Sequence, residues 1–469
     1  MDILELRSIK AVSSEVRDGI RVIQAQTDDD PRQCPFCNAL DPYKHDSRVQ
    51  EFADAPVRGA PVRIQIDRQR YRCRDCKKTF FQPLIGFSTK RDMTQRLVEY
   101  IAKDSLIRTF TDVSKDVGLD VQTVRDVFFD FSEWLRVYHP ISVPRVMGVD
   151  EAARAQVVLT AFTDIERRSY FDLIPSRKSA PLNAYLKAMP GKEMVQVVTM
   201  DLHLGFVTAI GKHFPHAVRV ADRFHVVRTA QVALSNFHAS LRKSLPKGLR
   251  LDSFRSRGAI STKESRLDDT GRKKVEDAFT ALPQLKQAHE AKERFLAIYD
   301  AKTRAAASKA MTEWVESLPP ELETHFAPAR NAIRDSRELI LNYFDHPFTN
   351  AYAEAANGIS KLIERVGRGY SFEVLRVKLL YGKRAQDVDS SGFDSNNPNN
   401  PKRVRTPKGK DLKAASKLSV PAYGLEPKGR LGARQADVER LIDEGYYDNG
   451  NDAIAKELGP LAHDFARKY

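Results

Sequence analysis

The stretch Met194-Val195-Gln196-Val197-Val198-Thr199-Met200-Asp201 is a β-prone run that ends at an aspartate. A second apolar run, Val146-Met147-Gly148-Val149, leads into the acidic pair Asp150-Glu151. Short apolar runs that alternate with helical patterns are typical of strands in an α/β domain. These two runs therefore determine the fold class predicted for the middle of the chain, and each places an aspartate at the end of a strand.

The segments around these two runs complete a mixed sheet. Residues 156–163, 169–174 and 217–221 are predicted strands, and residues 178–189 are a predicted helix. The resulting order is three strands, helix, strand, helix, strand. A three-strand meander followed by βαβ crossovers allows the first and fourth strands to be neighbours. We therefore expect Asp150 and Asp201 to face each other across one crevice.

Two neighbouring carboxylates predict a metal site. Like charges at short range repel unless cations neutralise them, and oxygen ligands of this kind suit Mg²⁺ or Mn²⁺. Two such ions about 3.5–4 Å apart would stabilise the attacking and leaving oxygens of a phosphoryl transfer. A single aspartate at a strand end more often caps a helix or a turn. The ordered set of acidic residues is what favours a catalytic site.

A third carboxylate is expected from a helix. Glu354 lies in the segment 349–358 (TNAYAEAANG), and Asn357 and Lys361 follow at helical spacing, so the three share one face. Considered alone, a solvated helix with an ordinary glutamate is the better interpretation. Three residues farther along the chain are candidates for holding phosphates: Arg365, Arg368 and Tyr370.

The chain has four cysteines, and all of them occur in two pairs of the form Cys-x-x-Cys, Cys34/Cys37 and Cys73/Cys76. Two such pairs make a tetrahedral sulfur site that suits a structural zinc ion, and the segment between them fits a strand hairpin. Incidental burial of the cysteines would not account for their pairing. His45 can replace a thiolate ligand, but an ordinary surface histidine is the favoured interpretation.

A helix-turn-helix is predicted between the zinc module and the sheet. The first helix spans 111–117 with Thr111 as its N-cap, Gly118 fits the turn, and Asp120 caps a second helix over 121–134. An ordinary helical hairpin is the alternative. In the DNA-binding form the second helix enters the major groove with residues near its N-terminus. The candidates for DNA contact are Gln122, Thr123 and Arg125.

The composition favours a polyanionic partner. The chain of 469 residues carries a formal net charge of +14 and has a pI of about 9.4, although a merely basic enzyme would also fit these values. Neither a signal peptide nor a run long enough to span a membrane is visible in the sequence. We therefore expect an intracellular protein with no membrane partner.

The chain resembles bacterial insertion-sequence transposases of the ISL-three (ISL3) group. The resemblance rests on CPFC with RYRCRDCKKTF, the helix-turn-helix, GVDE, VTMD followed by ADRFH, and NAYAEAANGISKLIERVGRGYSFEVLRVKLLY. It implies an RNase H-like core whose catalytic, magnesium-binding triad is Asp150, Asp201 and Glu354. The pair Asp222 and His225 resembles the C/DxxH motif of Mutator-like relatives. It is assigned a supporting role, with Asn357 and Lys361, and Asp222 is the main rival of Asp201.

The chain departs from the family pattern in one segment, and the role of one residue, Trp314, has two interpretations. Relatives commonly carry Glu-Gly-x-Asn, whereas this chain has Glu354-Ala355-Ala356-Asn357, which should preserve the helix. Trp314 lies in the predicted helical insertion. In some transposases an aromatic there stacks on a flipped base, but burial in the core is the favoured role because tryptophan is usually a buried anchor.

Together these observations predict a multidomain α+β protein. The predicted domains are a zinc-ribbon-like module (1–88), a helix-turn-helix domain (89–140), the first part of an RNase H-like core (141–227), a helical insertion (228–345), the Glu-bearing helices (346–385), a basic linker (386–418) and a helical tail (419–469).

The predicted function is DNA transposition. The protein would bind terminal inverted repeats and target DNA as a homodimer or larger assembly. It would then catalyse strand cleavage and strand transfer with two Mg²⁺ or Mn²⁺ ions, in the bacterial cytoplasm and on the nucleoid. Two alternatives remain open. One is a DNA-binding regulator derived from a transposase, and the other is an RNase H-like nuclease without strand transfer.

Overall fold

The computed structural model describes residues 6–7, 9–27, 30–154, 157–243, 245–246, 253–385, 387–390 and 392–393. Contacts divide these residues into two units, one of residues up to 140 together with those from 373 onward, and one of residues 141–372. The predicted basic linker, apart from its first few residues, and the predicted helical tail lie outside the described residues. No described helix combines the length and the apolarity needed to cross a membrane.

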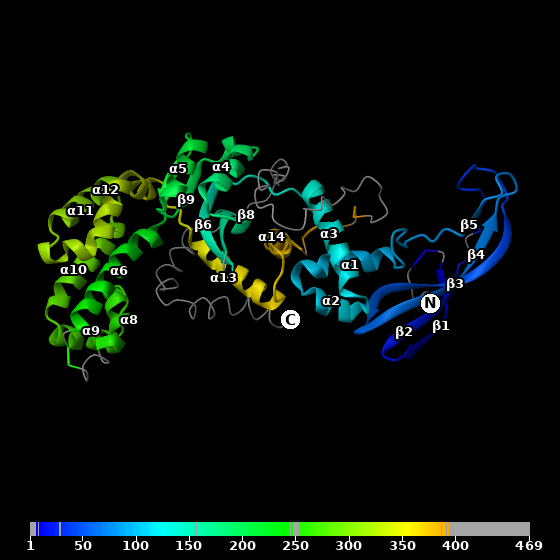
Figure 1. Ribbon diagram of the computed structural model, residues 1–469, viewed down its shortest axis with the longest axis horizontal. Coiled ribbons are helices and arrows are strands. Elements are labelled where there is room, and N and C mark those ends of the chain that lie inside the picture. The colour runs from blue at the N-terminus through cyan, green and yellow to red at the C-terminus, as the bar shows by residue number, and fades with distance from the viewer. Residues whose placement is uncertain are drawn as a thin grey trace. The chain divides into compact units, whose positions relative to one another are not determined.

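The first unit begins with a sheet whose strand order is β1-β2-β4-β3. Its members are β1 (Ile9–Arg17), β2 (Ile20–Thr27), β3 (Tyr43–Val57), β4 (Ala60–Arg72) and β5 (Thr79–Phe81), which pairs with β4 (Figure 1). On β4, Val62, Ile64 and Ile66 are fully buried in the core of this sheet and alternate with less buried residues, as a strand with one face on the core should. The β3–β4 hairpin, whose strands span 15 and 13 residues, confirms the predicted hairpin between the cysteine pairs.

Four helices complete the first unit: α1 (Gln95–Ile107), α2 (Phe110–Val117), α3 (Val121–Tyr138) and α14 (Phe372–Tyr381). The predicted helix-turn-helix corresponds to α2 and α3, with Gly118 in the left-handed conformation at φ 62°. The predicted cap Asp120 is confirmed, since its carboxylate accepts from the Thr123 N–H at 2.8 Å.

Two details of this prediction were wrong. Thr109, not Thr111, is the N-cap of α2. Its backbone is extended, its hydroxyl accepts from the Asp112 N–H at 3.1 Å, and buried Phe110 already belongs to the helix. In addition, α3 continues four residues beyond Trp134 to Tyr138, because Trp134 and Leu135 are both buried and keep the last turn packed.

The second unit is built on a sheet with the order β10-β9-β6-β7-β8. Its strands are β6 (Val146–Arg154), β7 (Val157–Asp164), β8 (Ser169–Ile174), β9 (Val197–Met200) and β10 (Val218–Ala221). β6, β7 and β8 form the predicted meander, and β9 and β10 run parallel to β6. This confirms the mixed sheet and the pairing of the first with the fourth strand. β9 is shorter than predicted because Lys192–Met194 form a 3-10 turn before it.

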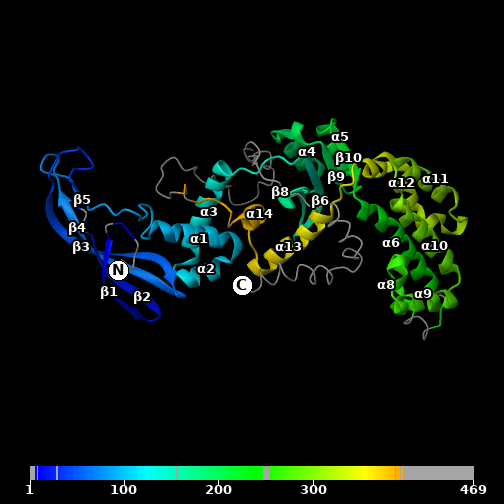
Figure 2. The same ribbon diagram turned by 180° about the vertical axis from the view of Figure 1, so that it is seen from behind.

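Helices lie on both sides of this sheet. α4 (Ser179–Ala188) and α5 (Leu204–His213) pack against each other, and α13 (Ala351–Gly367) packs on β6, β7 and β8. Both views show α13 on the opposite side of the sheet from α4 and α5 (Figures 1 and 2). The helix that carries Glu354 therefore crosses the strand that carries Asp150.

Residues between β10 and α13 form the predicted helical segment. Its helices are α6 (Arg223–Arg242), α8 (Arg257–Ser261), α9 (Asp269–Ala281), α10 (Gln284–Ala297), α11 (Arg304–Glu316) and α12 (Glu323–Asp345). Trp314 is 2% exposed, donates to the Ala291 carbonyl at 2.7 Å and contacts Phe295 edge-to-face. The preferred interpretation of Trp314 as a core residue is therefore confirmed.

Candidate active site and zinc centre

Three aspartates stand at the same level on three neighbouring parallel strands. The register pairs Val149 with Met200 and Met200 with Ala221, and an aspartate is the next residue in each case. Asp150 and Asp222 are buried, whereas the side chain of Asp201 is 25% exposed. Asp201 and Asp222 directly follow β9 and β10, and Asp150 lies level with them, so the three aspartates form a single acidic row. The strand end predicted at Asp150 was wrong, because β6 stays paired with β7 and continues to Arg154.

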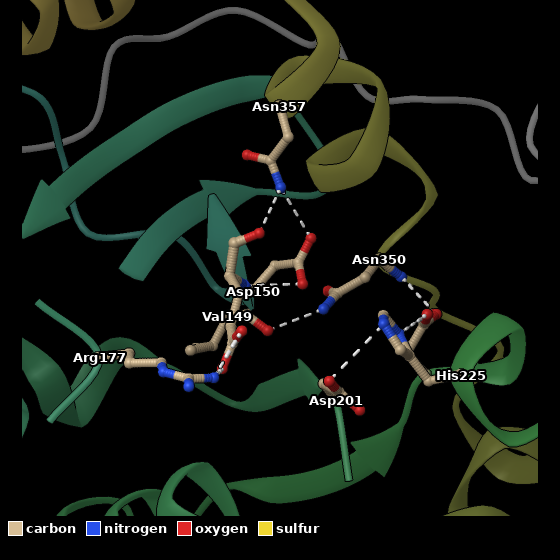
Figure 3. A network of polar contacts seen from close by, with 9 residues as sticks. Val149, Asp150, Arg177, Asp201, His225, Asn350 and Asn357 are labelled. Carbon is tan, nitrogen blue, oxygen red and sulfur yellow. Dashed lines mark hydrogen bonds and ion pairs between the residues drawn. The ribbon is translucent and has the colours of Figure 1, made fainter. Parts of the chain in front are cut away.

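Helix α13 is joined to this row by Asn357. The side-chain amide of Asn357 donates to the Asp150 carboxylate at 2.9 Å and to the Glu151 carbonyl at 3.1 Å (Figure 3). The hydroxyl of Tyr170, on β8, donates to the Asn357 oxygen at 3.3 Å. The amide nitrogen and the amide oxygen of Asn357 are thus both hydrogen-bonded. These bonds hold α13 against β6 and direct one Asp150 oxygen toward the helix.

The start of α13 is held by Asn350, a residue for which the sequence predicted no role. Its backbone N–H donates to Asp222 at 3.0 Å, and its side-chain amide donates to the Val149 carbonyl at 2.9 Å (Figure 3). Its side-chain oxygen accepts from the hydroxyl of Thr199. Asn350 therefore connects β6, β9 and the residue after β10 to the helix that carries Glu354. The signal in the sequence was an asparagine at a helix start, which is too common to identify a site.

Within the part of the chain that the structure describes, one group of acidic and histidine side chains has all its potential ligand atoms within 4.8 Å of one another. Its members are Asp222, His225 and Glu354. His225 Nδ1 lies 3.0 Å from Asp222, and its Nε2 lies 3.6 Å from Asp201. His225 thus bridges the second and third aspartates of the row. Both Asp222 oxygens accept hydrogen bonds from the protein, one from Asn350 and one from His225.

Burial and crowding perturb the protonation of these groups. Burial, together with the charges of Asp222 and Asp201, raises the pKa of Asp150 to about 7. Burial and the charge of Asp222 raise the pKa of Glu354 to about 9, and burial also raises the pKa of Asp201. Burial lowers the pKa of His225, but its hydrogen bond to Asp222 and the neighbouring carboxylates outweigh that effect and raise it to about 9.

These shifts fit a site that takes cations. Carboxylates that hold protons near neutral pH because they are buried together release them when a divalent ion supplies the opposing charge. The donors are carboxylate oxygens on a parallel strand edge, with one imidazole, and oxygen donors suit Mg²⁺ or Mn²⁺. The residues present therefore fit a hard divalent cation.

The remaining predicted residues on α13 lie away from the acidic row. Lys361, Arg365 and Arg368 are exposed, and Arg368 adopts the left-handed conformation at the end of the helix. Lys361 lies on the same face of α13 as Glu354 and Asn357, as the spacing predicted, but it is exposed whereas Asn357 is buried. Arg177, which the sequence did not single out, pairs with Glu151 at 3.0 Å beside Asp150 (Figure 3).

The candidates on α3 differ in their surroundings. Gln122 is exposed and donates to Asp126 at 2.9 Å. The Thr123 hydroxyl donates to Asp120 at 2.6 Å and so is part of the helix cap. Arg125 is partly buried. Of the three candidates on α3, Gln122 is therefore the most exposed to solvent.

The four cysteines converge at the base of the β3–β4 hairpin. Their sulfur atoms form a group within 4.8 Å, with Cys34 to Cys76 at 3.7 Å and Cys37 to Cys73 at 3.5 Å. Tetrahedral zinc–thiolate bonds of about 2.3 Å imply sulfur separations of about 3.8 Å, so the cluster fits one structural zinc ion. The residues after each pair, Asn38 and Lys77, share the left-handed conformation, so both knuckles turn in the same way.

Two family models match segments of the chain. A DDE transposase model of the ISL3 type, described as "Transposase", matches residues 147–379. A model described as the zinc-finger of the transposases IS204/IS1001/IS1096/IS1165 matches residues 30–76. Among curated proteins, none matches the chain. The two matched segments together cover more than half of the chain and contain the acidic row, Glu354 and all four cysteines, and the chain therefore belongs to the ISL3 family of DDE transposases.

Proposed function

We propose that this transposase binds the terminal inverted repeats of an insertion sequence and performs strand cleavage and strand transfer at Asp150, Asp201 and Glu354. The observation that carries the proposal is the row of three aspartates at one level of β6, β9 and β10, with Glu354 supplied by a helix packed on the same sheet. Four separate elements converge on one point, which is how catalytic carboxylates are commonly assembled in an α/β sheet.

Asp150, Asp201 and Glu354 would hold two Mg²⁺ or Mn²⁺ ions, which activate a water or a 3′-hydroxyl and stabilise charge on the phosphate. Asn357 orients Asp150 through its 2.9 Å hydrogen bond. Asp222 orients His225 and anchors the start of α13, since both of its oxygens already accept hydrogen bonds. Second-sphere hydrogen bonds of this kind fix the direction of a ligand.

Asp201 is favoured over Asp222 as the second ligand on two grounds. Asp201 follows the strand next to β6, and its side chain is 25% exposed, whereas that of Asp222 is 1% exposed. The opposing observation is that Asp222, and not Asp201, belongs to the compact group with Glu354. This makes the pair of aspartates the first target of mutagenesis.

DNA recognition is assigned to the first unit and to exposed cations of α13. We propose that α3 enters the major groove with Gln122, Thr123 and Arg125, and that Arg365 and Arg368 contact phosphates. Two transposon ends have to be processed together, so the active form would be a dimer or a larger assembly on DNA. Cleavage and joining would take place in the cytoplasm, on the nucleoid.

The decisive experiment is a cleavage and joining assay on DNA that carries the inverted repeats flanking the gene, with Mg²⁺ or Mn²⁺. We expect nicked ends and joined products. Binding without nicking would identify a regulator, and nicked ends without joined products would identify a nuclease.

The second ligand is tested by measuring Mn²⁺ affinity and cleavage for Asp201→Asn, Asp222→Asn and the control Glu193→Gln, whose side chain is exposed on the same unit. Asp201→Asn should abolish cleavage and weaken Mn²⁺ binding, while the control should resemble the wild type. If Asp222→Asn abolishes both and Asp201→Asn leaves both intact, Asp222 is the ligand.

A further inference from the structure

An arginine lies beside the acidic row, on the side of the sheet away from α13. Arg177 lies two residues before α4, and its guanidinium pairs with Glu151, the residue after Asp150. Consecutive residues of a strand point to opposite faces of a sheet. Because Asp150 meets Asn357 of α13, Glu151 points to the other face. Figure 3 shows Arg177 and Asn357 on opposite sides of Asp150.

Only part of the Arg177 guanidinium is used by this ion pair. Its Nη1 donates to both Glu151 oxygens, at 3.0 and 3.2 Å. Its Nε and Nη2 donate to no residue in the part of the chain that the structure describes, and the side chain is 50% exposed. A guanidinium is a planar fork whose paired N–H groups fit two oxygens of a phosphate. The Nε and Nη2 side of the fork is therefore available to such a ligand.

Glu151 gives this arginine a preset direction. Its backbone is held in β6, where it pairs with Thr160 of β7 and its carbonyl accepts from Asn357 at 3.1 Å. Its side chain is 28% exposed, so the glutamate is the more enclosed partner of the pair. An exposed ion pair contributes little to stability. A guanidinium that is already oriented, however, loses less entropy when it binds a ligand.

The position of the ion pair suits a ligand that also meets the acidic row. Asp150 stands level with Asp201 on the neighbouring strand, and Glu151 is the next residue of β6. Burial raises the pKa of Asp201, and the charges of Asp222 and Glu151 add to that rise, so Glu151 lies near Asp201 as well. A phosphate that approaches several carboxylates needs fixed positive charge beside it. Arg177 supplies such a charge.

We infer that Arg177 binds a non-bridging oxygen of the DNA strand, at the scissile phosphate or at a phosphate within two nucleotides of it. Glu151 is the positioning residue that presents the guanidinium. The contact is made to the sugar-phosphate backbone, so it carries no base preference. The inference rests on the proposed function, because it takes the acidic row as the place where the strand is cut.

The test uses inverted-repeat duplexes in which one phosphate at a time, within two nucleotides of the cleavage site on the cleaved strand, is replaced by an uncharged methylphosphonate. The full-length protein is bound in Ca²⁺, so that cleavage does not interfere. For the wild type, neutralising the contacted phosphate should weaken binding about 10-fold, the effect of losing a hydrogen bond between charged groups. Arg177→Gln should bind unmodified DNA about 10-fold more weakly and lose the sensitivity at that phosphate alone.

Arg145→Gln is the matched control. Arg145 is 45% exposed and also pairs with a glutamate, Glu166, but it lies where β6 begins, away from the acidic row. This variant should keep the wild-type sensitivity at every phosphate. A second variant keeps the charge and removes the fork. Arg177→Lys should restore the salt dependence of binding, whose slope Arg177→Gln lowers by about one unit.

Two variants of Glu151 test its positioning role. Glu151→Gln keeps an oxygen that accepts from Arg177, so it should retain the effect of the methylphosphonate at the contacted phosphate. Glu151→Ala removes the acceptor and should reduce that effect several-fold, because the guanidinium is no longer directed. Equal effects in the two variants would contradict the positioning role of Glu151.

The inference is overturned if the wild type is insensitive at every phosphate tested, or if Arg177→Gln keeps the full wild-type pattern. Loss of the same phosphate in Arg145→Gln would also overturn it, since the effect would then be one of general charge. An Arg177-dependent phosphate effect in Ca²⁺ without cleavage in Mg²⁺ or Mn²⁺ would keep the contact and remove the catalytic assignment. Cleavage by the wild type, with an unchanged phosphate pattern in Arg177→Gln, would do the reverse.

Discussion

Asn357 on α13 donates a 2.9 Å hydrogen bond to Asp150 on β6, across 207 residues of sequence. This bond joins the helix that carries Glu354 to the strand that carries the first aspartate. Together with the contacts of Asn350 at the start of α13, this hydrogen bond determines the position of Glu354 relative to the acidic row. The geometry of the site therefore depends on two asparagines as much as on the carboxylates.

Replacing Asn357 with alanine should lower Mn²⁺ affinity and the cleavage rate by about 10- to 100-fold, the usual effect of losing a hydrogen bond to a metal ligand. The fold should persist, because Ala353, Ala356 and Ile363 on α13 stay buried. Isothermal titration with Mn²⁺ and the cleavage assay check this. The control is Asn183→Ala on α4, whose side chain bonds to Ser179 and His213 away from the acidic row. Equal effects of the two variants would argue against the role of Asn357.

Gly148 on β6 leaves the space that Asn350 occupies. A methyl group at position 148 would lie 2.4 Å from the Thr163 hydroxyl oxygen and 2.8 Å from the Asn350 side-chain oxygen. Overpacking of this kind costs about 1–3 kcal/mol, so Gly148→Ala should lower the free energy of unfolding and reduce metal affinity as well. Chemical denaturation and Mn²⁺ titration measure both.

Gly258→Ala is the matched control for Gly148→Ala. Gly258 lies in α8, and nothing stands within 4 Å of the added methyl group. This substitution should leave stability unchanged or raise it by up to about 1 kcal/mol, since alanine restricts the unfolded chain. A destabilisation equal to that of Gly148→Ala would contradict the packing argument.

Lys378 should make the stability of the first unit depend on pH. Burial lowers its pKa from the ordinary 10.5 to about 7, and the side chain donates to the Arg108 carbonyl at 2.7 Å and to the Ser105 carbonyl. Between about pH 7 and 10.5 the unfolded chain therefore binds more protons than the folded chain, so this lysine's contribution to stability rises with pH through that window.

The difference in unfolding free energy between the wild type and Lys378→Met isolates this contribution, because the other titrations are common to both proteins. The difference should shift by up to several kcal/mol in favour of the wild type as the pH rises from 7 to 10. Denaturant midpoints at a series of pH values measure it. A difference that stays constant with pH would show that Lys378 keeps its ordinary pKa.

Removal of zinc should unfold the base of the β3–β4 hairpin, together with β5, and leave the second unit intact. Cys73→Ser should reduce bound zinc from one ion per chain to a small fraction, because loss of one thiolate opens the tetrahedral shell. Metal analysis by mass spectrometry, and hydrogen exchange at β3, β4 and β5, would report the change. Full zinc occupancy in the variant would contradict the four-cysteine assignment.

The sequence by itself determined the features that depend on local spacing. Two Cys-x-x-Cys pairs are enough to predict zinc, because a knuckle of four residues directs both thiolates to one side. The apolar runs before Asp150 and Asp201 predicted two strands, and strand order made the first and fourth strands neighbours. The strand end was correct for Asp201 only, because β6 continues through Asp150 to Arg154. Gly118 and Asp120 similarly marked the turn and the cap between α2 and α3, although the N-cap of α2 was placed two residues too late.

Only the tertiary structure decided which side chains meet. Asn350 reaches Val149 across 201 residues and Asp222 across 128. Asp222 stands level with Asp150 and Asp201 because β10 extends the sheet in register. Long-range contacts of this kind leave no periodic trace in the sequence, since each partner is selected by the packing of a whole element.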